Sequence, residues 1–155
     1  MKTVWVFLAD RILDNETVQQ LRGEVRSFLA DWKDHGKPIR SSLDVVNNAY
    51  FIVVADEERV DGCPTDDLYA FFKELGGRYG TDFLNRSVVG YIDGERQFRL
   101  TTLDELPRLY QEGKINDETL FYNHVVNTPE ELSDWLRPLR RLWVARFARR
   151  PVQAQ

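Results

Sequence analysis

The sequence is poor in the residues that most often cross-link a chain or carry its chemistry. Its 155 residues include one cysteine, Cys63, and two histidines, His35 and His124. A single cysteine excludes an internal disulfide and a zinc site built from several thiolates. No apolar run approaches the roughly 20 residues that a membrane-spanning helix needs. The apolar run within residues 3–10 is too short for a signal peptide with a cleavage site, so we expect a cytoplasmic protein.

The sequence also lacks a phosphate-binding loop. No stretch reads G-x-x-x-x-G-K-S/T, and the pair Gly113-Lys114 has neither the upstream glycine nor a following hydroxyl residue. Without such a loop there is no nest of backbone N–H groups to hold phosphates. We therefore expect no nucleotide cofactor, and no other cofactor is indicated.

What is present is typical of a globular protein. Hydrophobic residues make up 43% and charged residues 30% of the chain, and a chain of this length can bury a core without disulfides or a structural metal. The four tryptophans predict core or interface anchors. The net charge of −4 argues against non-specific binding of nucleic acid.

The chain is organised around the stretch from Tyr50 to Leu75. Residues 50–55 form an apolar run rich in β-branched and aromatic side chains, which predicts a buried strand. After a polar loop, Pro64 and the acids that follow it mark the first turn of a helix. Cys63 therefore lies where the strand gives way to the helix, which we expect to end at Gly76-Gly77.

The chain before this stretch predicts a strand over residues 2–9 and an amphipathic helix over 15–34, capped by Asp14 or Asn15. His35-Gly36 would end that helix in a left-handed cap, and Pro38 would prevent its continuation. A second strand is predicted over residues 41–46, and Asn47-Asn48 suits a tight turn into the third.

The chain after this stretch predicts shorter elements. Strands over 87–92 and 97–101 flank Asp93-Gly94, a strong hairpin signal. Capping boxes open helices at Thr102–Glu105 and Thr128–Glu131. The first helix would close at Gly113 before an extended segment over 119–126. The second would be a C-terminal helix, broken or kinked at Pro138.

The predicted order is β-α-β-β-α-β followed by smaller elements. The first six elements match the split βαβ, or ferredoxin-like, plan, so we expect an α+β fold. No linker rich in proline, glycine or serine divides the chain. We therefore predict one domain over 1–155, with a ferredoxin-like core over 1–92 and a C-terminal extension over 93–150.

Two resemblances to known families are visible. Residues 91–135 resemble the GYF-like family of small bacterial modules, through Asp93-Gly94, Thr102–Leu106, Gly113–Leu120 and Trp135. The resemblance implies a GYF-like C-terminal extension. Some members of the family bind proline-rich peptides, but the Gly-Tyr-Phe combination that names the family is absent here, so no residue takes over that role.

The whole chain also resembles an uncharacterised bacterial protein family of about this length. The matching residues are Trp32, His35, Gly36 and Pro38 in one stretch, and Gly62, Cys63 and Asp66 in another. Some members carry a transporter-ATPase label, which the missing phosphate-binding loop does not support.

Cys63 is the sharpest candidate for catalysis. A helix N-terminus stabilises a thiolate, and a nearby imidazole from His35 or His124 would make a cysteine–histidine dyad. Against this, Asp66 and Asp67 in the same turn disfavour a thiolate, and there is no second cysteine to resolve an oxidised form. The alternative is a cysteine that only packs or caps. The spacing of histidine, cysteine and carboxylates predicts no metal site.

The C-terminal segment is a local positive patch in an acidic protein. Its arginines alternate with aromatic and aliphatic side chains, and such a surface can contact an anionic partner. The candidate binding residues are Trp135, Arg140, Arg141, Trp143 and Arg146. The alternative is an amphipathic helix whose arginines pair with the protein's own acids. We therefore expect a non-enzymatic interaction module with a protein partner, and a thiol-dependent enzyme or redox sensor using Cys63 is the alternative.

Overall fold

A computed structural model describes residues 2–57 and 60–152. Helices and strands are mixed along the chain, so the α+β class is confirmed. The chain forms two compact units. Unit 1 comprises residues 1–85 and 126–133, and unit 2 comprises residues 86–125 and 134–155. No helix among the described residues is both long and apolar enough to cross a membrane.

The sheet of unit 1 has three strands, β1 (Thr3–Leu8), β5 (Tyr50–Ala55) and β4 (Ser41–Val46), in that order. Both pairings are antiparallel, and Trp5 and Leu43 both face Val53 in the register. All three strands lie where the sequence predicts them. The predicted turn between β4 and β5 is also present, because Asn47 and Asn48 both adopt positive φ.

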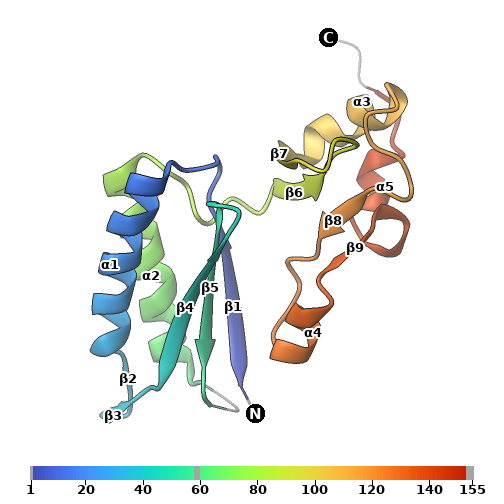
Figure 1. Ribbon diagram of the computed structural model, residues 1–155. Helices are drawn as coiled ribbons and strands as arrows, with labels where there is room; N and C mark the ends of the chain where they lie inside the picture. The colour runs from blue at the N-terminus through green and yellow to red at the C-terminus, as the bar shows by residue number, and fades with distance from the viewer. Residues whose placement is uncertain (1, 58–59, 153–155) are drawn as a thin grey trace. The chain divides into compact units, whose positions relative to one another are not determined.

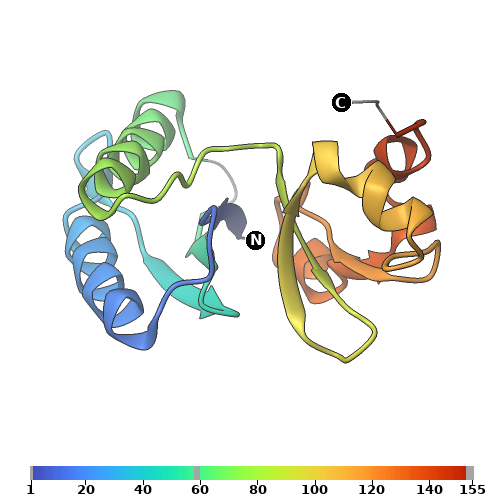
Figure 2. The same cartoon turned by 90° about the horizontal axis from the view of Figure 1, so that it is seen from above.

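Two helices, α1 (Asn15–Ala30) and α2 (Gly62–Tyr79), lie side by side on the same face of this sheet (Figures 1 and 2). Buried side chains of the helices and the sheet fill the space between them. At the centre of this core, Phe72 of α2 stacks on Phe7 of β1 with ring centroids 3.9 Å apart. Further rings meet Phe72 edge-on, from Phe51, Phe71 and Phe83.

Helix α1 begins as predicted, because the Asp14 side chain accepts a hydrogen bond of 2.7 Å from the backbone N–H of Thr17. The predicted end is wrong. The helix stops at Ala30, and the chain forms a small hairpin of β2 (Lys33–Asp34) and β3 (Lys37–Pro38). His35 and Gly36 form the two-residue turn of this hairpin, with φ of 51° and 79°. Positive φ at both positions is typical of a type I′ turn, which competes with a helix cap for the same residues.

Helix α2 also ends later than predicted. It continues through Gly76 and Gly77 to Tyr79, and Gly80 takes the left-handed cap conformation with φ of 62°. Gly76 has a packing reason to be glycine. A Cβ atom there would lie only 2.2 Å from the backbone oxygen of Thr81.

The predicted fourth strand of the ferredoxin-like sheet is not in this sheet. Residues 88–92 form β6, which pairs with β7 (Phe98–Thr102) on one edge and β8 (Leu120–Tyr122) on the other. With both edges occupied, β6 has no free edge to offer to β1. Instead, residues 126–133 belong to unit 1, where the backbone N–H of Val4 donates to the carbonyl of Asn127 at 3.0 Å.

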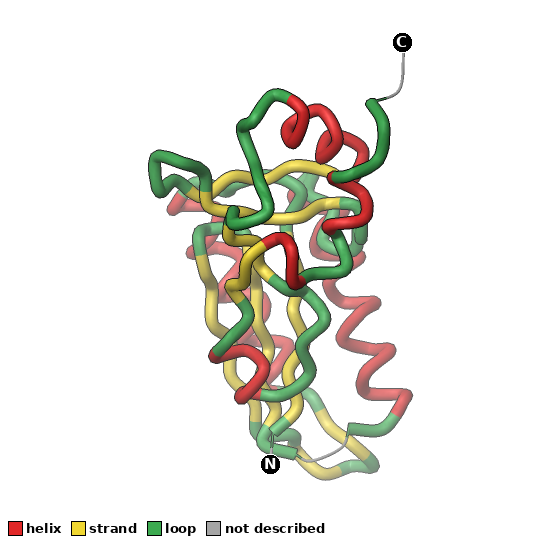
Figure 3. The backbone as a smooth tube through the Cα atoms, turned by 90° about the vertical axis from the view of Figure 1, so that its right-hand side faces the viewer, coloured by secondary structure: helices red, strands yellow, loops and turns green. Residues whose placement is uncertain are grey.

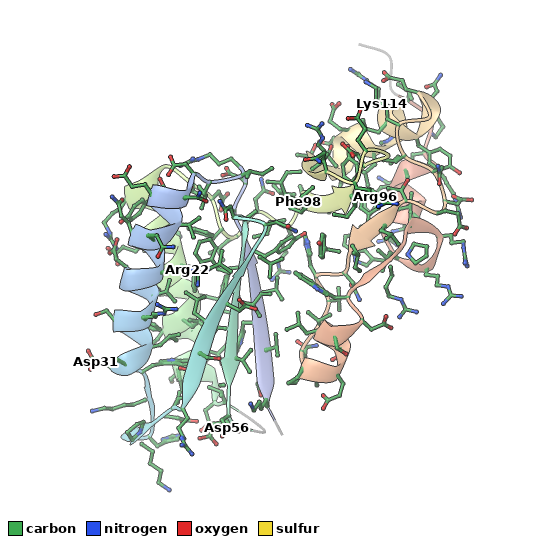
Figure 4. The ribbon with its side chains drawn as sticks, in the orientation of Figure 1. Arg22, Asp31, Asp56, Arg96, Phe98 and Lys114 are labelled. Atoms are coloured by element: carbon green, nitrogen blue, oxygen red, sulfur yellow. The ribbon has the colours of Figure 1, made fainter. Side chains whose placement is uncertain are left out.

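Unit 2 is built on a sheet of order β7-β6-β8-β9, in which β9 is Leu136–Pro138. The hairpin predicted at Asp93-Gly94 is present, but its turn spans residues 93–97, and the Asp93 side chain accepts from the N–H groups of Glu95 and Gln97. Figure 4 labels Arg96 at this turn and Phe98 on β7. Short helices pack with the sheet, namely η1 (Leu103–Glu105), α3 (Leu106–Gln111), η2 (Leu139–Arg141) and α5 (Ala145–Ala148).

The predicted C-terminal helix is wrong. The chain instead forms the short helix α4 (Pro129–Ser133) in unit 1, then β9, η2 and α5 in unit 2, and the tube in Figure 3 shows only short helical pieces there. Pairing with β8 extends the chain at Pro138, which cannot donate a helical hydrogen bond. The capping box at α4 is confirmed by the bond from the Glu131 N–H to the Thr128 hydroxyl. The one predicted at Thr102 is absent, because its side chain makes no capping bond.

Candidate functional site

Cys63 is the second residue of α2, directly after the N-cap residue Asp61 and Gly62. The predicted place of the thiol at the start of this helix is therefore confirmed, and its side chain is exposed. Within the described residues the thiol makes no hydrogen bond. The site thus offers an accessible sulfur, and no described residue forms a hydrogen bond that would activate it.

His35 lies close to the start of α2, but it engages a carboxylate and not the thiol. Its Nε2 atom is 2.5 Å from Oδ2 of Asp61 and 3.5 Å from Oδ1 of Asp34. The ring itself is 79% exposed. The structure therefore brings the two predicted catalytic residues to the same end of unit 1, with Asp61 as the direct partner of the imidazole.

Hydrogen bonds join the β2–β3 hairpin, and Trp32 just before it, to the start of α2. Trp32 is buried, and its indole N–H donates to the carbonyl of Pro64 at 2.9 Å. The Asp34 carboxylate accepts from the backbone N–H of Asp61 at 3.3 Å. In Figure 1 the hairpin lies at the end of α1, and these bonds join it to the first turn of α2. These two hydrogen bonds and the hairpin turn fix the position of His35.

Sequence reasoning missed Asp34 and Asp61. Both were within reach of a local argument, because Asp61 precedes the helix start where an N-cap is expected, and Asp34 precedes a two-residue turn ending in glycine. What the sequence does not show is that the turn and the helix start meet in space.

His124 lies in unit 2, whereas Cys63 lies in unit 1. Its side chain is half-buried, and the loss of water around the ring lowers the pKa of His124 to about 4. The imidazole is therefore neutral at physiological pH.

The C-terminal arginines fall into two groups. In the first group each guanidinium pairs with a carboxylate of unit 2: Arg140 with Glu118 at 2.8 Å, Arg149 with Asp117 at 3.0 Å and Arg137 with Asp134 at 3.7 Å. Arg140, a predicted binding residue, therefore has an internal partner. In the second group are Arg141, Arg146 and Arg150, for which no carboxylate of the described chain lies within ion-pair distance.

Two arginines of the second group lie beside an aromatic pair, in which Trp143 is exposed and Phe147 is partly buried. Trp143 is 43% exposed, and its ring meets Phe147 edge-on with centroids 5.6 Å apart. The guanidinium carbons of Arg146 and Arg150 lie 5.3 Å and 4.2 Å from the centroid of the Phe147 ring. We call these four residues the Trp143 patch. Trp135, another predicted binding residue, packs on Tyr122 at 4.6 Å and is not part of it.

A shallow hollow adjoins the Trp143 patch through Arg150. Its volume is about 650 Å³. Its walls come from α3 and from the chain after α5, namely Pro107, Tyr110, Gln111, Ala148, Arg149, Arg150, Pro151 and Val152. The alternation of arginine and apolar residues visible in the sequence extends to Phe147 and Arg150, which lie outside the five candidate binding residues.

Comparison with protein-family models, with curated proteins and with solved structures gave no match. The GYF-like and uncharacterised-family resemblances therefore stay predictions.

Proposed function

We propose that this protein is a non-enzymatic interaction module that binds an acidic protein segment through the Trp143 patch of unit 2. The proposal also keeps the GYF-like character of residues 91–135 as an expectation. The observation that carries it is the exposed Trp143, whose ring meets the partly buried Phe147 beside two arginines without carboxylate partners in the described chain.

The exposure of Trp143 is the first step of the argument. A tryptophan that leaves much of its ring in water forgoes the free energy that burial would supply, at about 25 cal/mol per Å². Tryptophan and arginine are also the residues most enriched at the centres of protein interfaces. An exposed tryptophan beside arginines therefore favours a binding surface over a purely structural role.

The charge pattern is the second step. The chain carries a net charge of −4, yet Arg141, Arg146 and Arg150 lack carboxylate partners in the described chain. Three neighbouring arginines, in contrast, are paired within unit 2. The unpaired set is thus available for carboxylates of another molecule, and a segment that combines acidic and apolar side chains complements the patch.

The test uses a fluorescein-labelled peptide of alternating glutamate and leucine, with fluorescence anisotropy as the measurement. We expect Trp143→Ala to weaken binding about tenfold or more, as for other central interface tryptophans. The double variant Arg146→Gln, Arg150→Gln should also weaken it, and added salt should do the same, because exposed charges are screened.

Two controls make this test specific. Arg96→Gln removes one positive charge from the same unit, at the β6–β7 turn, and should leave the affinity within about twofold, well under 1 kcal/mol. The same peptide with lysine in place of glutamate should not bind. Equal binding of both peptides, or no effect of Trp143→Ala, would contradict the proposal.

The alternative function, a thiol-dependent enzyme or redox sensor, draws on one observation. Cys63 is exposed in the first turn of a long helix, where the helix dipole favours an anion. Its test is the rate of iodoacetamide alkylation against pH, in the parent protein and in His35→Asn. A rate that is already constant at neutral pH, and that falls in His35→Asn, would favour the enzyme over the interaction module.

A further inference from the structure

We propose that Asp34, His35 and Asp61 form a binding site for a divalent transition-metal ion of the zinc class. The three residues come from two segments that the fold brings together, the β2–β3 hairpin and the start of α2. One ligand atom from each lies within 4.8 Å of the other two. The site belongs to unit 1 and is independent of the Trp143 patch.

The spacing of the three atoms suits a small cation. Zinc binds nitrogen and oxygen at about 2.1 Å, so two ligands of a tetrahedral zinc ion lie about 3.4 Å apart. The separation between Oδ1 of Asp34 and Nε2 of His35 is already 3.5 Å. The shorter separation of 2.5 Å between His35 and Asp61 has to open by about 1 Å, which a side-chain rotation at this exposed edge allows.

One oxygen of the cluster has no hydrogen bond. Oδ1 of Asp34 is fully buried and accepts no bond, although the other oxygen of the same carboxylate accepts from the N–H of Asp61. A buried acceptor without a partner costs free energy. This oxygen is an unsatisfied ligand atom, and Nε2 of His35 lies 3.5 Å from it.

The imidazole cannot satisfy both carboxylates. Nε2 carries at most one hydrogen, and the contact with Asp61 at 2.5 Å takes it, which leaves Asp34 at a distance too long for a hydrogen bond. A cation in place of that single proton would contact all three atoms at once. Three protein ligands also leave a fourth position for water, the arrangement found in open zinc sites.

The Asp61 carboxylate is not needed for the helix. Asp61 is the N-cap residue of α2, yet its side chain makes no capping hydrogen bond and turns to His35. The donor set of one imidazole and two carboxylates favours zinc, cobalt or manganese over magnesium and calcium, which prefer oxygen alone. We therefore take zinc and cobalt as the probes.

The experiment measures metal binding directly, without any assumed activity. Protein freed of metal with a chelator is titrated with Zn²⁺ by calorimetry, and with Co²⁺ by its visible absorption, which reports ligand number and geometry. We expect one ion per chain. Asp34→Asn, His35→Asn and Asp61→Asn should each weaken binding at least about tenfold, since even supporting residues of metal sites have effects of this size.

The variants are chosen to preserve the fold. Asparagine tolerates the positive φ at residue 35 and is a good N-cap at residue 61, and circular dichroism will check each variant. Asp66→Asn and Cys63→Ser are the controls, because Asp66 is an exposed acid of the same helix beyond its first turn and the Cys63 sulfur is not among the three clustered ligand atoms. Both should keep the parent affinity.

Three outcomes would overturn the site. The first is binding to the parent protein weaker than about 1 mM. The second is binding that persists in all three ligand variants, and the third is an equal loss in Asp66→Asn, which would show a diffuse effect of charge. Selective loss in the three ligand variants supports the site, whatever the outcome at Trp143.

Discussion

The two compact units differ in how they hold their short and long elements in place. Unit 1 packs two long helices on a sheet around clustered aromatic rings, with Phe72 and Phe7 at the centre. Unit 2 has helices of no more than six residues, a mainly aliphatic core, and polar ties such as that between Asp117 and Arg149. A short helix cannot sustain itself in water, so unit 2 depends more on side chains that fix its loops.

This difference shows which charged and polar side chains of each unit lack a partner within the described chain. In unit 2 the arginines that hold the loops have carboxylate partners, so those left over, such as Arg146 and Arg150, stand out as candidates for binding. In unit 1 the Asp34–His35–Asp61 cluster lies at an exposed edge of the apolar core, and Oδ1 of Asp34 is buried there without a hydrogen bond. The comparison therefore separates residues that stabilise the fold from exposed residues that are available to bind another molecule.

The largest expected effect is at Phe72. Phe72→Ala removes a fully buried ring from the centre of the aromatic cluster and should lower the free energy of unfolding by about 3–5 kcal/mol. Urea denaturation measures it. Phe72→Leu should cost less, because it refills part of the cavity and loses mainly the ring contacts. A cost below about 1 kcal/mol for the alanine variant would contradict the central role of this ring.

The next effect compares two adjacent glycines of α2. Gly76→Ala places a Cβ atom against the backbone oxygen of Thr81, and the shift that follows should cost about 1–3 kcal/mol. Gly77→Ala meets nothing within 4 Å and should stabilise the helix by about 0.5–1 kcal/mol. Thermal denaturation of the pair measures the difference, and equal melting temperatures would contradict the close approach at Gly76.

The sequence predicted unit 1 better than unit 2, for a physical reason. Strands β1, β4 and β5 and the starts of both helices follow from local signals: alternating or continuous apolar runs, the Asp14 cap and the Asn47-Asn48 turn. The error at His35-Gly36 lay between two motifs that both require positive φ. The sequence predicted the left-handed conformation at Gly36, but it predicted a helix cap where the chain forms a hairpin turn.

The errors in unit 2 arise from pairing between distant residues. Leu132, Trp135, Leu136 and Leu139 have helical spacing, yet residues 136–138 pair with β8 as a strand. Such pairing overrides local propensity and leaves no trace in the segment itself. The same holds for β6, whose two partners decide its sheet, and for the proposed metal site, in which Asp61 lies 26 residues after His35.

A smaller effect tests the polar ties of unit 2. Bonds from Arg149 and Tyr110 lower the pKa of Asp117 below its ordinary 3.8. A lowered pKa means that the folded state favours the carboxylate, so its contribution to stability is present above pH 3.8 and is lost as the pH falls through the folded-state value. Asp117→Asn should lower the melting temperature at neutral pH and flatten its decline in acid.

The control for Asp117 is Asp134→Asn. Asp134 is 74% exposed and lies 3.7 Å from Arg137, a separation at which a surface pair contributes little. Melting curves between neutral pH and strong acid should therefore match those of the parent protein. If the two variants behave alike, the tie at Asp117 does not distinguish unit 2 from an ordinary surface.

The smallest expected effect on stability is at Arg146, and it tests whether this residue stabilises unit 2 or serves in binding. Arg146 is exposed, and its described contact is with the Phe147 ring at 5.3 Å. Arg146→Gln should therefore change the free energy of unfolding by no more than about 0.5 kcal/mol, measured by urea denaturation, while it weakens binding of the acidic peptide together with Arg150→Gln. Arg149→Gln should do the reverse, because Arg149 ties the loop at Asp117. A large loss of stability in Arg146→Gln would place this arginine with the residues that hold unit 2 together, and the binding surface would then reduce to Trp143 and Arg150.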